Sequence, residues 1–159
     1  MRKAIFPGSF DPFTVGHESI VQRAISLFDE IIIAIGHNAN KEGFFPVGQR
    51  KKWIEEIFKN EPSISVEIYS GLTVEYCKQK DIRFILRGLR TATDFEYERA
   101  IGQVNRAMYA NIETVYLLTL PEHTAISSTI VREIIRYQGD VSKFVPDIIN
   151  NDLKNKNKV

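Results

Sequence analysis

The pattern of apolar and polar positions along the chain predicts alternating strands and helices. Short runs rich in Ile, Val and Phe, bounded by turn residues, indicate strands. We expect five of them, at residues 3–6, 30–36, 63–69, 83–86 and 113–118. Residues 31–35, 84–86 and 115–118 are continuous apolar runs, which is typical of central strands covered on both faces.

The longer segments between these runs repeat their apolar residues every three or four positions, which predicts amphipathic helices. We expect helices at residues 17–28, 47–59, 72–80 and 93–110, one more from residues 127–129, and a short one after Pro146. Thr93 and Glu96 have the spacing of a capping box for the fourth of these helices. Its buried face is expected to consist of Ala100, Ile101, Val104, Ala107 and Met108.

Strands that alternate with helices are typical of α/β proteins. We therefore expect a Rossmann-like fold, a doubly wound, five-stranded parallel sheet with helices on both faces. No repeat, linker or low-complexity tract interrupts the sequence, so residues 1–159 are expected to form a single domain, with 154–159 as a frayed polar tail. A chain of this length buries about 68–70% of its surface, which is enough for a core without cross-links.

Composition narrows the expected partners and compartment. The 21 basic and 20 acidic side chains leave a net charge of +1, which gives no reason to expect nucleic acid or a membrane as a partner. The apolar start of the chain ends at Pro7, too early for a signal peptide. The single cysteine, Cys77, cannot form an internal disulfide, and no Cys/His spacing predicts a metal site in the protein. We therefore expect a cytoplasmic protein.

Residues suited to chemistry follow four of the predicted strands. In an open parallel sheet, ligands bind beyond the carboxyl ends of the strands. The relevant segments are residues 7–17 after the first strand, Lys41 after the second, residues 87–90 after the fourth, and residues 123–129 after the fifth. We expect these segments, which are distant in sequence, to meet in one pocket.

The first of these loops has the chemistry of an anion cradle. We expect Pro7 to halt the strand, Gly8 to allow a close backbone approach to a ligand, and the Ser9 hydroxyl to add a hydrogen bond. The helix expected to open at His17 has partial positive charge and free N–H donors at its N-terminus, which favour phosphate. The same field disfavours a protonated imidazole, so His17 is predicted to be a neutral donor.

Arg87 and Arg90 flank Gly88 at the end of a predicted buried strand. Two guanidinium groups at the ligand edge of the sheet suit separate phosphate groups, although either arginine alone would usually be a solvated side chain. Residues 127–129 either cap the following helix or provide a second helix N-terminus for phosphate. The sequence contains neither a Walker A motif nor a Gly-x-Gly-x-x-Gly motif.

These loops resemble the motifs of the nucleotidylyltransferase superfamily. Residues 14–17, Thr-Val-Gly-His, are similar to its (T/H)-x-G-H signature, and residues 126–129, Ile-Ser-Ser-Thr, to its second motif, I-S-S-x. Four further segments are more specific and resemble those of the bacterial phosphopantetheine adenylyltransferases. These segments are residues 7–12, 87–90, 94–98 and 138–141. The resemblance extends from about residue 3 to residue 146.

The resemblance implies transfer of AMP from ATP to 4′-phosphopantetheine, giving dephospho-coenzyme A and pyrophosphate in coenzyme A biosynthesis. It also implies Mg²⁺ carried with ATP, a homohexamer, and direct in-line attack without a covalent enzyme intermediate, with His17 stabilising the transition state. The residues implied in ATP binding are Ser9, Phe10, His17, Gly88, Leu89, Arg90, Glu98, His123, Thr124, Ala125, Ile126, Ser127, Ser128 and Thr129. Those implied in phosphopantetheine binding are Ser9, Lys41, Thr73 and Arg87.

Two other functions remain open from the sequence. One is adenylyl transfer to a different acceptor, such as nicotinate mononucleotide, with the ATP half of the site unchanged. The other is a non-catalytic domain that binds a nucleotide or coenzyme A, which would leave His17 without a role.

Overall fold

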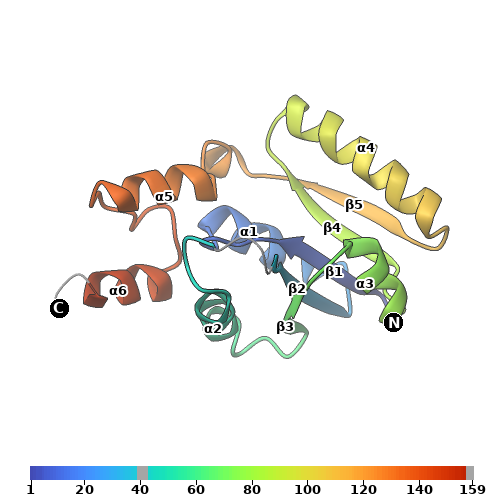
Figure 1. Cartoon of the computed structure of the whole chain (residues 1–159), viewed down its shortest axis with the longest axis horizontal. Helices are drawn as coiled ribbons and strands as arrows, with labels where there is room; N and C mark the ends of the chain where they lie inside the picture. The colour runs from blue at the N-terminus through green and yellow to red at the C-terminus, as the bar shows by residue number, and fades with distance from the viewer. Residues whose placement is uncertain (39–42, 157–159) are drawn as a thin grey trace.

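The computed structural model describes residues 1–38 and 43–156, and a five-stranded parallel sheet forms its centre (Figure 1). The strands are β1 (Lys3–Gly8), β2 (Glu30–Gly36), β3 (Ile64–Tyr69), β4 (Phe84–Leu89) and β5 (Glu113–Leu118). Their spatial order is β3-β2-β1-β4-β5, so the direction of winding reverses between β1 and β4. The predicted doubly wound α/β fold is confirmed, and its ligand crevice is expected beyond the ends of β1 and β4.

β1 and β4 separate toward their carboxyl ends. Only two residue pairs, the second of them Ile5 with Ile85, are in register between these strands, whereas β1 pairs with β2 as far as Gly8. Pro7 is part of β1, in register with Ala34, so the expectation that it halts the strand is wrong. Proline is tolerated in this central strand because β4 has already moved away, and no N–H is needed there.

Helices cover both faces of the sheet. They are α1 (Val15–Ala24), α2 (Val47–Ile57), α3 (Thr73–Gln79), α4 (Ala92–Met108), α5 (Ser128–Arg136) and α6 (Asp147–Lys156). Helices α1, α2, α5 and α6 pack against one face through a core that includes Phe6 and Ile33. Helix α3 packs on the opposite face with Ile5 and Ile32. Alternate residues of β1 and β2 therefore enter different cores, which explains why both strands are apolar after their first residues.

β5 differs from its predicted place in the sheet. Its apolar run at 115–118 indicates a central strand, but β5 is at the edge, and β1 is the central strand. Leu118 is 71% exposed at the end of β5. The apolar run at 115–118 led to the wrong position because apolar residues indicate that a strand is covered, but they do not indicate where in the sheet it lies.

Helix α4 differs most from its prediction. Its N-cap is Thr91, whose hydroxyl accepts from the backbone N–H of Asp94, so the predicted capping box at Thr93 and Glu96 is wrong. Its predicted buried face, which consists of Ala100, Ile101, Val104, Ala107 and Met108, is exposed, with Val104 at 58% and Met108 at 44%. Among the residues of α4, all of which the structure describes, only Glu98 is buried. The helix lies along β5, at the edge of the sheet, where the described chain leaves its apolar face uncovered (Figure 1).

Two helix ends also differ from expectation. Helix α1 begins at Val15, two residues before His17, and ends at Ala24, four residues before its expected end at Phe28, although Phe28 is still buried. Helix α6 continues to Lys156, through part of the tail that was expected to fray. No helix in the described part of the chain is both long enough and apolar enough to cross a membrane.

Candidate active site

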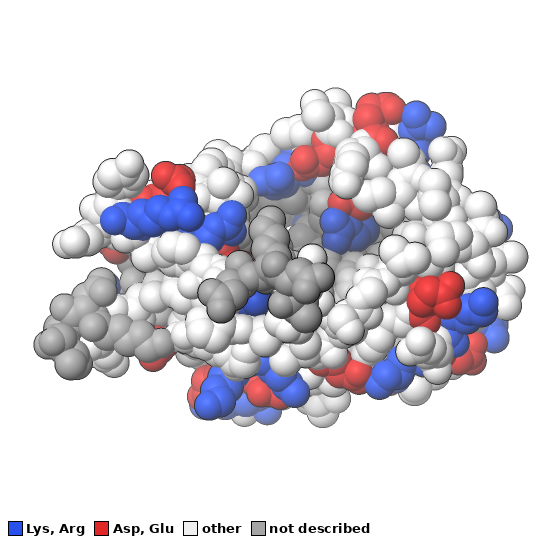
Figure 2. All heavy atoms as spheres, viewed as in Figure 1, with Lys and Arg blue, Asp and Glu red and all other residues white. Residues whose placement is uncertain are grey.

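A cavity of about 320 Å³ opens beyond the carboxyl ends of β1 and β4. Figure 2 shows this face of the molecule hollowed near its centre, with Lys and Arg side chains at the rim. The cavity is lined by four segments that are far apart in sequence, as the strand order requires. The polar side chains among its lining residues are Ser9, Thr14, His17, Arg87, Arg90, Asp94, Tyr97, Glu98, Thr119, His123, Ser127 and Ser128.

A second cavity of similar volume adjoins the first. The two share lining residues at the end of β1, in the loop after it, on β4 and on α4, among them Ser9, Arg87 and Glu98. Away from this boundary the second cavity is bounded by α3, α4 and β5, and its further lining residues include Tyr69, Thr73, Ile101, Gly102, Asn105 and Thr114. Two compartments that meet at a shared boundary can hold two substrates with their reacting groups next to each other.

The loop after β1 is shaped by Gly8 and Phe10. Phe10 has a φ of 47°, and its ring is buried against Phe6 and Phe13, with centroids 5.3 Å away in both cases. A Cβ on Gly8 would lie 2.8 Å from the Phe10 ring, which is closer than carbon atoms approach. Gly8 is therefore required because the Phe10 ring packs onto its backbone, and the ring forms the floor of the cavity at this point.

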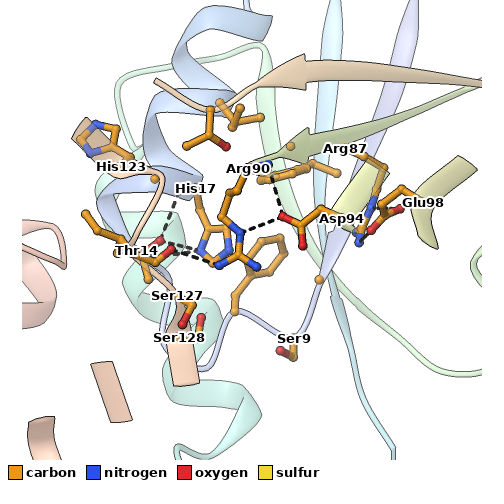
Figure 3. A pocket seen from close by; sticks show the side chains of 18 of the residues that line it. Ser9, Thr14, His17, Arg87, Arg90, Asp94, Glu98, His123, Ser127 and Ser128 are labelled. Atoms are coloured by element: carbon orange, nitrogen blue, oxygen red, sulfur yellow. Dashed lines mark hydrogen bonds and ion pairs between the residues drawn. The ribbon is translucent and has the colours of Figure 1, made fainter. Parts of the chain in front are cut away.

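His17 is held in one orientation by Thr14, the N-cap of α1 (Figure 3). The backbone N–H of Thr14 donates to Nδ1 of His17 over 3.0 Å, and the Thr14 hydroxyl accepts from the backbone N–H of His17 over 3.3 Å. Because Nδ1 accepts, a neutral ring carries its proton on Nε2. The ring of His17 also packs against Phe10 at 5.1 Å and Phe13 at 5.3 Å between centroids.

The environment of His17 keeps the imidazole neutral, as predicted. Burial, and to a lesser degree the charges of Arg87 and Arg90, together lower the pKa of His17 to about 4. The expected cause of this neutrality was the field at the start of a helix. Enclosure by aromatic rings and two neighbouring guanidinium groups are the causes in the folded protein.

Arg87 and Glu98 form a two-pronged ion pair at the boundary of the two cavities (Figure 3). Nε of Arg87 donates to Oε2 of Glu98 over 2.9 Å, and Nη2 donates to the other carboxylate oxygen. Nη1 of Arg87 donates to the carbonyl of Pro7 over 2.6 Å, across the gap between β1 and β4. Glu98 is 8% exposed, so it holds the guanidinium in a fixed place beside both compartments.

Arg90 reaches across the mouth of the first cavity. Its Nε donates to Oδ2 of Asp94 over 3.1 Å, and its backbone N–H also points to that oxygen, at 3.2 Å. On the opposite wall, Ser127 is the N-cap of α5 and its hydroxyl accepts from the backbone N–H of Ile130. A guanidinium group and a helix N-terminus therefore face the same space, which favours a bound anion.

The sequence matches known nucleotidyltransferases over nearly its whole length. The cytidylyltransferase-like family model matches residues 5–134. Over 149 residues the chain is 56% identical to a phosphopantetheine adenylyltransferase of Flavobacterium psychrophilum, covering 94% of this chain and 98% of the relative. Over 146 residues it is 52% identical to one of Bacteroides fragilis, covering 92% and 97%. The chain belongs to the phosphopantetheine adenylyltransferase family. It is therefore a nucleotidyltransferase, as its motifs predicted.

A solved structure supports the fold of this family member. It is that of a proposed nicotinate-nucleotide adenylyltransferase from Vibrio parahaemolyticus, with a TM-score of 0.67 over 96% of this chain and 99% of that one. Its sequence identity of 19% supports the shared architecture and nothing more specific.

Most residues that the motifs of the phosphopantetheine adenylyltransferases indicated lie together in the structure. The first cavity is lined by Ser9, Phe10, His17, Gly88, Arg90, Glu98, His123, Ile126, Ser127 and Ser128, and the second by Ser9, Thr73 and Arg87. The residues that line neither cavity are Leu89, Thr124, Ala125 and Thr129. Leu89 is buried at the end of β4, where its carbonyl accepts from Thr119. Lys41 lies outside the described residues.

Several residues that line the cavities had no predicted role. Asp94, Tyr97 and Thr119 line the first cavity, and Tyr69 and Asn105 line the second. Asp94 had a usable signal, because it follows Arg90 by four residues at the start of a predicted helix. The other four are common polar or aromatic residues, and their spacing in the sequence matches no known motif.

Proposed function

We propose that this adenylyltransferase transfers AMP from ATP to 4′-phosphopantetheine, giving dephospho-coenzyme A and pyrophosphate. The observation that carries this proposal is the junction of two cavities at Ser9, Arg87 and Glu98. ATP would occupy the first cavity and phosphopantetheine the second, so that the acceptor phosphate meets the α-phosphate of ATP at the junction. The names of the relatives support the choice of substrates.

The mechanism we propose is direct in-line attack of the acceptor phosphate on the α-phosphorus. The acceptor oxygen forms the new bond as the bond to pyrophosphate breaks, so no protein nucleophile is needed. The Nε2 proton of His17 would donate to the oxygen on which charge develops. Because His17 is already neutral and oriented by Thr14, no proton transfer and no rotation of the ring are needed during the reaction.

Cationic groups would hold the two phosphate-bearing substrates. Arg90 and the N-terminus of α5 at Ser127 and Ser128 face the space proposed for the ATP phosphates. Arg87 would bind the acceptor phosphate with the N–H groups that Glu98 and Pro7 leave available. Thr73, with its hydroxyl 2.7 Å from that of Tyr69, lines the part of the second cavity proposed for the pantetheine chain.

Mg²⁺ fits this site as an ion carried by ATP. Within residues 1–38 and 43–156, no group of three or more His, Cys, Asp or Glu side chains could hold a metal ion. The two carboxylates of the first cavity, Asp94 and Glu98, are each engaged with an arginine. The triphosphate would therefore supply the oxygen ligands, and the bound ion would neutralise part of its charge. The residues of the chain would orient the phosphates around it.

We also propose that the enzyme assembles as a homohexamer and works in the cytoplasm. The exposed apolar face of α4, with Val104 and Met108, supports self-association, because a monomer rarely leaves such a stripe uncovered. The cytoplasmic assignment depends on the absence of any disulfide, since Cys77 is buried and free.

A single assay tests the reaction and the acceptor together. Purified protein with Mg-ATP and 4′-phosphopantetheine should release pyrophosphate and form dephospho-coenzyme A, detected by mass spectrometry. Nicotinate mononucleotide in place of phosphopantetheine should give no pyrophosphate. Turnover with nicotinate mononucleotide alone would reassign the acceptor, and folded protein that binds ATP without turnover on either acceptor would favour a non-catalytic domain.

A further inference from the structure

Side chains from three other elements hold carbonyl groups at the end of β1 and in the loop that follows it. Each donor is a guanidinium group or a hydroxyl, and each occupies one carbonyl oxygen. The pairs are Arg87 with Pro7 at 2.6 Å, Arg50 with Ser9 at 2.5 Å, Arg132 with Asp11 at 2.7 Å, and Ser128 with Pro12 at 2.8 Å. These bonds fix the directions of the peptide groups in a loop that has no regular secondary structure to do so.

Arg50, on α2, is the least exposed of these donors, at 5%. Its Nη1 donates to the carbonyl of Ser9, and its Nε donates to the carbonyl of Phe45 over 3.0 Å. Arg50 lines neither cavity. This arginine therefore binds backbone carbonyls and is not placed to bind phosphate, although it lies one peptide group away from the proposed phosphate site.

Asp11 completes a buried pair with Arg50. Its carboxylate accepts from the backbone N–H of Phe44 over 2.7 Å and from that of Phe45 over 2.9 Å, and Oδ1 lies 4.0 Å from Nε of Arg50. A Cβ on Gly43 would lie 2.9 Å from Nη2 of Arg50 and 3.0 Å from Oδ2 of Asp11. The pair thus joins residues 43–45 to the loop after β1, at a point with no room for another side chain.

We propose that Asp11 and Arg50 are positioning residues that fix the Ser9 peptide at the boundary between the two cavities. This inference rests on the proposed adenylyl transfer, because Ser9 lines both compartments where the two substrates would meet. A displacement of about 1 Å in a group that orients reacting atoms can lower the rate by about 10². The pair acts through the backbone of Ser9 and touches neither substrate.

The test compares Arg50→Met, which keeps the stem but removes the donors, with Arg50→Lys, which can still reach one carbonyl. Arg50→Met should lower kcat for pyrophosphate release by about 10–10², with a smaller change in the KM for ATP. Arg50→Lys and Asp11→Asn should each lower kcat by less than Arg50→Met does, because each keeps some of the hydrogen bonds. The control is Asp152→Ala, which removes bonds to Gln49 and Trp53 on the same helix, away from the cavities.

Amide hydrogen exchange supplies a readout that does not depend on activity. Peptides that contain residues 8–13 should exchange at least about 10-fold faster in Arg50→Met than in the wild type, but not in Asp152→Ala, even where both variants lower the unfolding temperature equally. If Arg50→Met and Arg50→Lys keep kcat within twofold of the wild type and leave the exchange of this loop unchanged, the proposal is wrong. Faster exchange with an inactive wild type would instead contradict the proposed function and leave the positioning role standing.

Discussion

The backbone N–H of Thr14 donates to Nδ1 of His17 over 3.0 Å, and this bond decides which nitrogen of the imidazole carries the proton. The same threonine is the N-cap of α1. The residue that begins the helix therefore also places the proton of His17 on Nε2, from which it can be donated to a ligand. The spacing of the motif has a physical reason, since an N-cap and the third helical residue are three positions apart.

Replacing His17 should affect the chemistry more than substrate binding. We expect His17→Ala to lower kcat by about 10²–10³, as when one transition-state donor is removed, while ATP still binds. Steady-state pyrophosphate release and calorimetric titration with ATP measure the two quantities. His37→Ala is a suitable control, because His37 is exposed beyond β2 and lines neither cavity. An unchanged kcat in His17→Ala would exclude this residue from the chemistry.

The pKa of His17 predicts how stability depends on pH. Burial, then Arg87 and Arg90, lower this pKa from 6.5 to about 4 in the folded protein. Between these two values the unfolded chain binds a proton on this ring that the folded protein does not, so the free energy of unfolding rises with pH. The contribution is fully present above about pH 6.5 and is lost as the pH falls toward 4.

Urea unfolding at several pH values checks this sign. The wild type should lose stability between pH 6.5 and 4, and His17→Ala should lose less over the same interval. His17 should add no inflection to the rate near pH 6.5, because it stays neutral well below that pH, so an inflection from the substrate phosphates should be the same in the wild type and in His17→Ala. If the rate profile of the wild type contains a group with an apparent pKa near 6.5 that is missing in His17→Ala, the ring of His17 is solvated instead.

The sequence predicted the convergence of the site because strand ends impose it. His17 follows β1 and Arg90 follows β4, and parallel strands that neighbour each other deliver such residues to the same edge. The strands and α-helices of the described residues were anticipated as well, because the apolar periods of strands and helices differ clearly. The predictions failed at α4 and at β5. Their apolar patterns predicted burial, but no part of the described chain covers the apolar face of α4 or the outer edge of β5.

The sequence did not predict which charged groups pair inside the site. Arg87 and Glu98 were given to different substrates, yet they bind each other, because β4 and α4 bring positions 11 residues apart together. Arg50 and Asp11 are 39 residues apart and of common types, so no spacing rule connects them. Such pairs depend on how side chains fill a packed interior, which local periodicity does not encode.

The ion pair between Arg87 and Glu98 should matter for both substrates. Glu98→Gln removes the charge but keeps the size, and we expect kcat/KM to fall by about 10-fold or more for ATP and for phosphopantetheine alike, since a guanidinium at the boundary loses its fixed place. Glu96→Gln, on the same helix, is the control, because Glu96 and Arg99 form an exposed pair. A loss for one substrate only would place Glu98 in direct contact with that substrate.

Removal of Mg²⁺ should abolish turnover without destabilising the protein. If ATP carries the ion, a chelator should stop pyrophosphate release. It should leave the unfolding temperature of the nucleotide-free enzyme unchanged, because a protein that binds no Mg²⁺ gains no stability from it. Thermal scans with and without the chelator measure this directly. A lower unfolding temperature with the chelator would indicate a metal site formed by the protein.

The apolar face of α4 predicts that association depends on this helix. Val104 is 58% exposed and Met108 44% exposed on a helix that leans on the edge of the sheet. Val104→Glu should lower the mass seen by sedimentation from about 110 kDa, that of six chains of 18.3 kDa, toward that of smaller species, because a charge would be buried unpaired in the interface. Ser26→Glu, on the opposite side of the sheet and exposed, should leave the mass unchanged. A hexamer that survives Val104→Glu would mean that the subunits meet through another surface, and a wild type that sediments as a monomer would leave the exposed stripe on α4 to a different partner.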